Sequence, residues 1–280
     1  LMSIANEAGV HLELNDFDRI SREVPYICNL KPSGKYPIVA LHEIGGLPAV
    51  LKAIEGKLKD GHLTVTGKTL KENLKNQELV ENDIIYPLSA PKNPEGGIAI
   101  LYGTLAPDGA VVKKSGVKPC MYQFEGRARV FHSMEDASYA VSNDLIQEGD
   151  VIVIRYEGPK GGPGMREMHM TTSLLVGRGM DESCALVTDG RFSGSTRGPC
   201  IGHISPEAAE GGPIAAVEEG DRIRIDIPNR RLDLLVPQEV IEERLKHVVP
   251  VYKERTPSLA KYASLVTSAD KGAILRIEKK

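Results

Sequence analysis

Two glycine-rich segments carry the side chains best suited to chemistry. The first, which we call the glycine–proline loop, is residues 157–168, with the sequence EGPKGGPGMREM. Proline fixes the backbone and glycine permits unusual angles, so the segment favours a defined path that other groups can approach closely. Near its end, Glu167 offers the hard oxygen ligand that Mg²⁺ prefers. The pattern also fits an ordinary surface loop, and it lacks the Gly-Lys-Ser/Thr ending of a phosphate-binding loop.

The second segment, which we call the serine loop, is residues 188–200, with the sequence TDGRFSGSTRGPC. Hydroxyl side chains at 193, 195 and 196 crowd between glycines, and Arg191 and Arg197 stand on either side of them. Such a loop at a strand end can hold an anion or present a nucleophile or base, although a polar turn has the same composition. The Gly-x-Ser-x-Gly elbow of hydrolases does not match around Ser193. We interpret the nearby His203 as structural rather than as a base.

These segments closely resemble the dihydroxy-acid and phosphogluconate dehydratase family. The resemblance continues through GPCIGHISPEAAEGGPIA, GDRIRIDIPNRRLDLLV, EGRARVF and DVIVIRYEG, and back to LKPSGKYP, GGLPAVLK and TVTGKTLKENL near the start of the chain. It covers nearly the whole sequence. Within the family, TDGRFSG followed by GPCIGHISPEA is similar to the branched-chain amino-acid enzyme, because sugar-acid members usually have Met where this chain has Phe192.

The resemblance implies a hydro-lyase that dehydrates 2,3-dihydroxy-3-methyl carboxylic acids to 2-oxo acids in valine, isoleucine and leucine biosynthesis. Glu167 matches the family's Mg²⁺-binding glutamate, and Ser193 matches its proposed proton acceptor. A free serine is too weakly acidic for that role, so cations are needed nearby, and Arg191 or Arg197 could join Mg²⁺ in supplying them. Ser195 could hydrogen-bond the same group. We therefore expect Ser195 and the two arginines to contact substrate.

The departure from the family is as informative as the match. Family members carry a long N-terminal half with three cysteines for an iron–sulfur cluster, 2Fe-2S or 4Fe-4S, and with an aspartate and a carboxylated lysine for Mg²⁺. The four cysteines here, at 28, 120, 184 and 200, do not match those ligands. The chain therefore resembles the C-terminal half of the family and is expected to be inactive alone. A sugar-acid dehydratase and a non-catalytic module remain alternatives.

Composition excludes several other classes of protein. The net charge of −3, from 35 basic and 38 acidic residues, argues against a nucleic-acid partner. We expect no membrane partner, since no apolar run approaches the length of a membrane-spanning helix, and no signal peptide, since no basic region precedes an apolar stretch. Cysteines without paired spacing fit free thiols in the cytoplasm, or in an organelle matrix. The resemblance implies a small-molecule dihydroxy acid as partner and a homodimer at full length.

Short strands bounded by glycine must position both loops. Strands are predicted at 98–102, 110–114, 128–131, 151–156, 185–188, 222–227 and 232–236. Helices are predicted after the N-caps Ser133 and Thr256 and over 237–248. We predict an α+β fold with a boundary near residue 85: 1–85 as the C-terminal remnant of the family's N-terminal α/β domain, and 86–280 as a β-barrel-like C-terminal domain with peripheral helices. The resemblance implies the swivelling kind of barrel.

Because each loop directly follows a buried strand, we expect both loops to leave the same end of the barrel. Glu167 and Ser193 should then lie close together and face one surface.

Overall fold

The computed structural model describes residues 1–251, 253 and 255–276. The chain divides into two compact units. One, the barrel unit, combines Leu1–Asp18 with Ile98–Lys280, and the other, the helical unit, is Arg19–Gly97. No helix within the described residues is long and apolar enough to cross a membrane.

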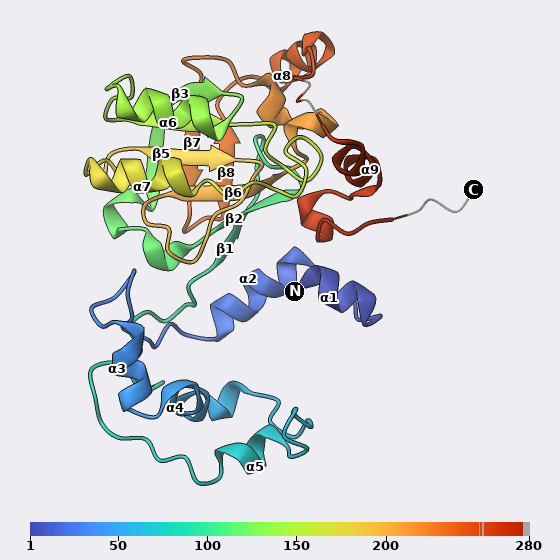
Figure 1. The fold of residues 1–280 in the computed structure, drawn as a ribbon. Helices are drawn as coiled ribbons and strands as arrows, with labels where there is room; N and C mark the ends of the chain where they lie inside the picture. The colour runs from blue at the N-terminus through green and yellow to red at the C-terminus, as the bar shows by residue number, and fades with distance from the viewer. Residues whose placement is uncertain (252, 254, 277–280) are drawn as a thin grey trace. The chain divides into compact units, whose positions relative to one another are not determined.

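The barrel unit is built around one eight-stranded sheet in the order β1-β2-β6-β5-β4-β3-β7-β8 (Figure 1). The strands are β1 Ala99–Leu101, β2 Gly109–Val112, β3 Gln123–Phe131, β4 Asp150–Ile154, β5 Ala185–Thr188, β6 Cys200–Ser205, β7 Arg222–Asp226 and β8 Arg231–Leu234. A bridge between Tyr102 and Arg231 joins the two outer strands, and the amide of Leu232 donates to the carbonyl of Tyr102 at 3.0 Å. The sheet is therefore nearly closed, which confirms the prediction of an α+β fold with a barrel-like sheet.

The middle of the sheet is parallel. Strands β3, β4, β5 and β6 pair in parallel, whereas the outer pairs are antiparallel. In the β4–β5 pair, Ile154 stands opposite Thr188, so both strands end at the same edge. The glycine–proline loop and the serine loop therefore leave the same end of the barrel, as the sequence predicts.

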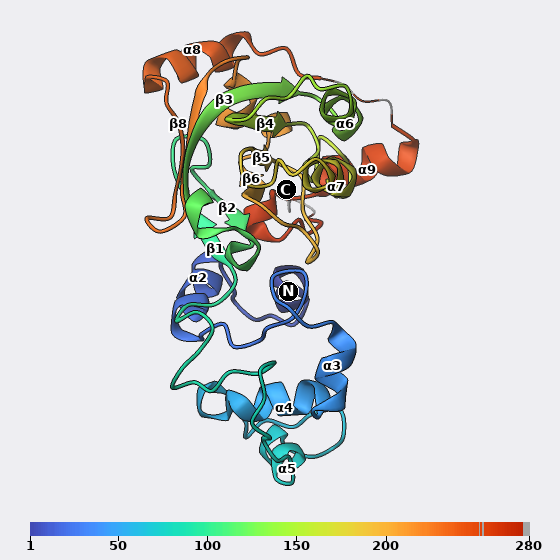
Figure 2. The same cartoon turned by 90° about the vertical axis from the view of Figure 1, so that its left-hand side faces the viewer.

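Strand β4 is buried on both faces, which explains its continuous apolar sequence. Val151 and Val153 belong to the cluster that fills the barrel, whereas Ile152 and Ile154 belong to a second cluster on the outer face. Helices α6 (Met134–Ser142) and α7 (His169–Gly177) cover that outer face, side by side in Figure 2.

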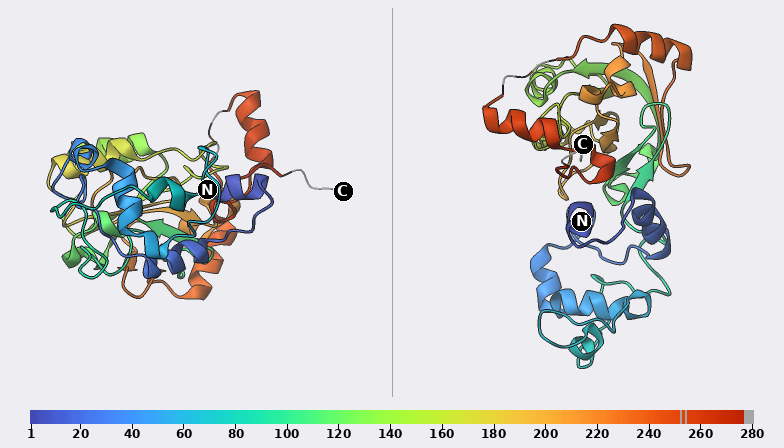
Figure 3. Two further views of the ribbon diagram at one scale, coloured as in Figure 1. Left: turned by 90° about the horizontal axis from the view of Figure 1, so that it is seen from below. Right: turned by 90° about the vertical axis from the view of Figure 1, so that its right-hand side faces the viewer.

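The remaining helices of the barrel unit are peripheral. They are α1 Met2–Glu7, the first part of α2 Leu14–Glu23, α8 Gln238–His247 and α9 Pro257–Leu265, with α8 and α9 at separate places on the surface (Figures 2 and 3). The predicted N-caps are present, because Ser133 accepts from the amide of Asp136 and Thr256 from that of Leu259. Within the predicted barrel-like domain, 86–280, strand β6 and helix α7 were not predicted from the sequence.

The helical unit contains three further helices around a small core. They are α3 Ile38–Glu43, α4 Gly46–Ala53 and α5 Leu70–Leu74, and the core residues are Ile27, Leu41, Ala49, Ile84 and Ile85. Thr69 and Glu72 form a reciprocal capping box at the start of α5. Several large apolar side chains of this unit remain exposed, among them Ile38, Val39, Leu47, Leu63 and Val65.

Candidate active site

The two loops are joined to each other directly beyond the strands. Glu167 and Arg191 form a parallel bridge. The amide of Arg191 donates to the carbonyl of Arg166 at 3.1 Å, and the amide of Met168 donates to the carbonyl of Arg191 at 3.0 Å. Paired strands lie about 4.8 Å apart, so the bridge sets Glu167 next to Arg191, which precedes Ser193 by two residues.

The Glu167 carboxylate is poised to bind a cation. Its Oε1 atom is buried and has no hydrogen-bond partner among the described residues. A buried carboxylate oxygen without a partner is costly, and a hard cation would relieve that cost. No trio of His, Cys, Asp and Glu side chains within the described residues could complete a metal site. Glu167 therefore fits Mg²⁺ as one ligand of a larger set.

Ser193 and Ser195 form a pair of hydroxyl groups at the tip of the serine loop. Their Oγ atoms are 2.7 Å apart, and the amide of Ser195 approaches the Oγ of Ser193 at 3.3 Å. Ser193 is half-buried and Ser195 is exposed. A proton can pass between the two hydroxyls at this distance, so the arrangement suits a group that accepts and returns a proton.

The two arginines of the serine loop have exposed side chains. The Nε of Arg191 donates to the carbonyl of Met165 at 2.9 Å, which ties it to the glycine–proline loop. Neither arginine is brought to Ser193 by a hydrogen bond in the described part of the chain. Their predicted contact with substrate stays a prediction.

Sequence reasoning missed a cation that the structure places on the serine loop. The Nζ of Lys113, just after β2, donates to the carbonyls of Gly194 and Thr196, the latter at 3.3 Å. Burial, and then the charge of Arg197, lowers the pKa of Lys113. This contact depends on the pairing of β2 with β6, which no local sequence pattern indicates.

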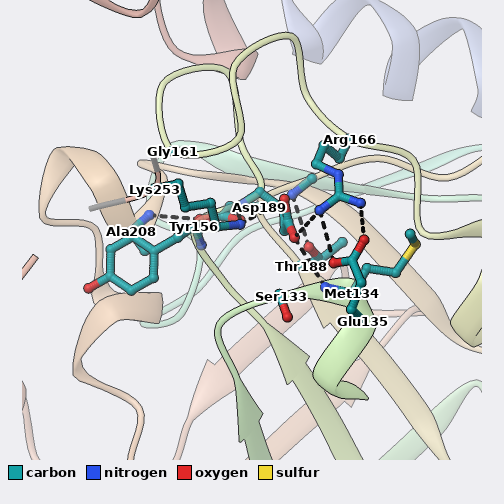
Figure 4. Close-up of polar contacts among 12 residues, drawn as sticks. Ser133, Met134, Glu135, Tyr156, Gly161, Arg166, Thr188, Asp189, Ala208 and Lys253 are labelled. Atoms are coloured by element: carbon teal, nitrogen blue, oxygen red, sulfur yellow. Dashed lines mark hydrogen bonds and ion pairs between the residues drawn. The ribbon is translucent and has the colours of Figure 1, made fainter. Parts of the chain in front are cut away.

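Glu157, at the start of the glycine–proline loop, is a second residue that the sequence did not single out. It is fully buried. Its Oε1 accepts from the amide of Met134 at 3.1 Å and from Arg166 at 3.2 Å, and its Oε2 lies 3.0 Å from the Nζ of Lys253 (Figure 4). Glu157 is thus a structural anchor for the loop, held by two cations.

The cysteines do not fit an iron–sulfur cluster. Cys28 is half-buried in the helical unit, Cys120 is exposed, and Cys184 and Cys200 are buried in the barrel unit. Burial raises the pKa of the Cys200 thiol to about 12, whereas a cluster needs thiolates. The four cysteines do not converge, since no group of three or more His, Cys, Asp and Glu side chains among the described residues could hold a metal.

The chain is similar to known proteins over nearly its whole length. Residues 83–273 match the family described as dihydroxy-acid/6-phosphogluconate dehydratase C-terminal, and residues 1–73 match the corresponding N-terminal family. A dihydroxy-acid dehydratase of Geobacter metallireducens is 56% identical over 279 residues, which are 99% of this chain and 50% of the relative. One of Pyrococcus furiosus is 54% identical over 278 residues, with 99% of this chain and 50% of the relative covered.

A dihydroxy-acid dehydratase of Clostridium novyi is 56% identical over an alignment of 280 residues, with 98% of this chain and 50% of the relative covered. The chain thus spans about half the length of the curated relatives it matches. The family match covers both loops and every strand of the barrel. This chain belongs to the dihydroxy-acid/6-phosphogluconate dehydratase family.

Proposed function

We propose that this chain carries the proton-accepting and part of the Mg²⁺-binding machinery of a hydro-lyase. The reaction would convert 2,3-dihydroxy-3-methyl acids to 2-oxo acids for the synthesis of branched-chain amino acids. The observation that carries the proposal is the bridge between Glu167 and Arg191, which sets a buried carboxylate oxygen without a partner beside the loop of Ser193 and Ser195.

Ionised Ser193 would remove the proton from C2 of the substrate while the C3 hydroxyl departs as hydroxide, and Ser193 would then return that proton to the hydroxide, which releases water. The enol that results then tautomerises to the 2-oxo acid. Ser195 lies at hydrogen-bond distance and would stabilise the ionised Ser193. The ammonium of Lys113 adds positive charge on the same loop, which favours ionisation of a hydroxyl nearby.

Glu167 would contribute one oxygen ligand to Mg²⁺. Bound Mg²⁺ supplies charge neutralisation for the substrate carboxylate and the developing enolate. Because one carboxylate leaves most of an octahedral shell to other groups, we expect this chain alone to bind Mg²⁺ weakly. Arg191 and Arg197, exposed next to this site, would attract the anionic substrate.

The remaining ligands would come from the part of the relatives that this chain does not span. Exposed apolar side chains in the helical unit support that division, since Ile38, Val39 and Val65 are 68%, 61% and 106% exposed. We propose that residues 1–85 complete an N-terminal domain and that 86–280 form the barrel-like domain. The iron–sulfur cluster, 2Fe-2S or 4Fe-4S, would be held by the N-terminal domain.

Two further properties follow from the resemblance and stay predictions. The free thiols suit a reducing cytoplasm or organelle matrix. A homodimer is expected for the full-length enzyme. Sedimentation of the full-length protein at micromolar concentration tests the second property directly.

A substrate panel on the full-length enzyme tests the function. We expect 2-oxo acid to form from 2,3-dihydroxy-3-methylbutanoate in preference to 6-phosphogluconate and aldonates. Preference for a sugar acid would instead establish the alternative dehydratase. No turnover of either class, in a preparation with full iron and sulfide content, would establish a non-catalytic role.

The Mg²⁺ assignment has its own test. Glu167→Gln should raise the Mg²⁺ concentration for half-maximal activity about tenfold or more, because a neutral amide is a weaker ligand than a carboxylate. Glu148→Gln is the matched control, since Glu148 is exposed at the opposite end of β4. Equal Mg²⁺ dependence of the two variants would remove Glu167 from the metal site.

A further inference from the structure

Two buried carboxylates near the loops have no role in the chemistry described so far. Asp189, the second residue of the serine loop, is fully buried. Its Oδ1 accepts from the amide of Glu157 at 2.9 Å, and its Oδ2 accepts from the amides of Tyr156 and Ala208, each at 3.0 Å (Figure 4). One side chain therefore joins the starts of both loops to the segment that follows β6.

Glu207, in the segment after β6, holds the glycine–proline loop at a second place. It is 1% exposed. Its Oε1 accepts from the amide of Lys160 and its Oε2 from the amide of Gly161, each at 2.8 Å. The contact is close, because a Cβ added to Gly158 would lie 2.6 Å from the Oε2 of Glu207. Glycine at 158 is thus required for this carboxylate to reach the backbone.

The backbone held by these carboxylates is in an uncommon conformation. Tyr156, whose amide donates to Asp189, has a φ of 63°, and Met165, further along the loop, has a φ of 55°. Left-handed backbone at residues other than glycine costs about 1–3 kcal/mol and persists only where the surroundings enforce it. Asp189 supplies that enforcement at Tyr156, whose amide donates to it.

Burial of these groups is also unfavourable in itself. Burial, and then the neighbouring Asp189, raises the pKa of Glu207 to about 7, against the hydrogen bonds from Gly161 and Lys160. Burial likewise raises the pKa of Asp189. Apolar side chains would avoid that cost but would leave the backbone amides without acceptors, so what the two acids contribute here is the hold on the backbone.

We propose that Asp189 and Glu207 are positioning residues of the dehydration site. They hold the backbone of residues 156–161 against the start of the serine loop, which keeps Glu167 and Ser193 at a fixed separation. The inference rests on the proposed function, because the separation matters only if one residue binds the metal and the other takes the proton.

The first test measures the hydrogen bonds themselves, on the chain of 280 residues. In Asp189→Asn and Glu207→Gln, hydrogen exchange should become about tenfold faster or more at the amides that donate to the altered side chain. Amides of β4 should keep their wild-type rates. The matched controls are Asp226→Asn and Glu219→Gln, which also remove a carboxylate. Asp226 accepts from the amide of Asn229, and Glu219 accepts from the amide of Val130.

The second test separates positioning from folding, on the full-length enzyme. Per folded molecule, Asp189→Asn should lower kcat about tenfold or more with a KM changed less than about twofold, since the base is displaced while binding groups remain. Glu207→Gln should instead raise the Mg²⁺ requirement, and excess Mg²⁺ should restore kcat. If Asp189→Asn fails to fold, the Glu207→Gln result decides whether the positioning role holds.

Three outcomes are distinguishable. At the amides that donate to Asp189 and Glu207, exchange as slow as in the control variants would overturn the positioning role. A normal kcat and a normal Mg²⁺ requirement per folded molecule would overturn it too. In both cases the dehydratase function stands. A wild-type enzyme without dehydratase activity would overturn the function, and with it the positioning role. Local exchange changes together with the two distinct kinetic defects would support both.

Discussion

The two loops leave the same edge of one sheet, but they are held in opposite ways. Side-chain carboxylates accept the backbone amides of the glycine–proline loop, at Glu157, Lys160 and Gly161. In the serine loop, the backbone carbonyls of Gly194 and Thr196 accept from the ammonium of Lys113. Acids thus accept from the amides of the glycine–proline loop, whose carbonyls at Lys160 and Gly161 also accept from Arg255, whereas a lysine donates to the carbonyls of the serine loop.

This difference matches the chemistry proposed for each loop. The glycine–proline loop has both acids and cations as neighbours, so its site for a cation is the unpartnered carboxylate oxygen of Glu167 at its end. Positive surroundings favour ionisation of a hydroxyl and attract an anionic substrate, and Ser193 is on the loop next to Lys113 and Arg197. The same barrel edge therefore offers a carboxylate that can bind a cation and a hydroxyl on a loop that a cation contacts.

The largest expected effect comes from removing the proton acceptor. Ser193→Ala in the full-length enzyme should lower kcat about a thousandfold, within the range typical of a lost general base. Ser195→Ala is the informative partner, because it removes only the hydrogen bond to Ser193 and should cost about tenfold. Steady-state assays at saturating Mg²⁺ measure both, and cluster absorbance should stay unchanged. Equal losses in the two variants would argue that Ser193 is not the base.

The next effect concerns the acids around the glycine–proline loop. An unfolded chain releases the Glu207 proton near its ordinary pKa of 4.5, whereas the folded chain keeps it until the raised pKa of about 7. Folding stability in the wild type is therefore reduced progressively as pH rises from 4.5 to 7, by up to about 3 kcal/mol. Glu207→Gln lacks this group, so its stability relative to wild type should rise by that amount over the same window.

Urea unfolding at pH 4.5, 5.5 and 7 measures that difference. Any constant loss from the weakened hydrogen bonds to Lys160 and Gly161 cancels in the pH dependence. Burial, and then Arg191, lowers the pKa of His203 to about 4, which makes the stability of both proteins rise between pH 4 and 6.5 and also cancels. If the difference in free energy of unfolding between the two proteins does not change with pH, Glu207 is already ionised at pH 5.

A smaller effect tests how closely each loop is packed. In Gly158→Ala the new Cβ meets the Oε2 of Glu207 at 2.6 Å, so we expect a loss of about 2 kcal/mol in the free energy of unfolding. The matched change in the serine loop is Gly194→Ala, where an added Cβ meets nothing within 4 Å, and it should be close to neutral. Thermal or urea unfolding of both variants measures the loss of unfolding free energy in each. Similar losses would show that the loops do not differ in packing.

The sequence predicted the elements whose pattern is local. The alternation of polar and apolar residues over 222–227 predicted β7, and the continuous apolar run before Tyr156 predicted β4. Strand β6 was missed because Gly202 and His203, which has a φ of 58°, interrupt its pattern. Helix α7 was missed because its sequence, HMTTSLLVG, contains β-branched residues and has no capping side chain.

The candidate site likewise contains residues that local sequence patterns indicate and residues that they do not. Glu167 and Ser193 stand out because motifs surround them, and their loops do pair, although their roles stay predictions. Asp189 and Glu207 were passed over because their partners are backbone amides more than thirty residues away or on the far side of β6. Such contacts exist only once the parallel strands have aligned, so composition and spacing do not reveal them.

The smallest effect is expected at Lys113, the cation of the serine loop. Lys113→Met keeps the length of the side chain and removes its charge and its donors, so the carbonyls of Gly194 and Thr196 lose a partner. If that charge assists ionisation of Ser193, kcat should fall about fivefold, which is about 1 kcal/mol, and the pKa governing kcat should rise. Lys114→Met, one residue further on, is the neighbouring control. Lys113→Arg keeps the charge, so a pH profile restored by arginine but not by methionine would assign the effect to electrostatics, whereas equal defects would assign it to the geometry of the loop.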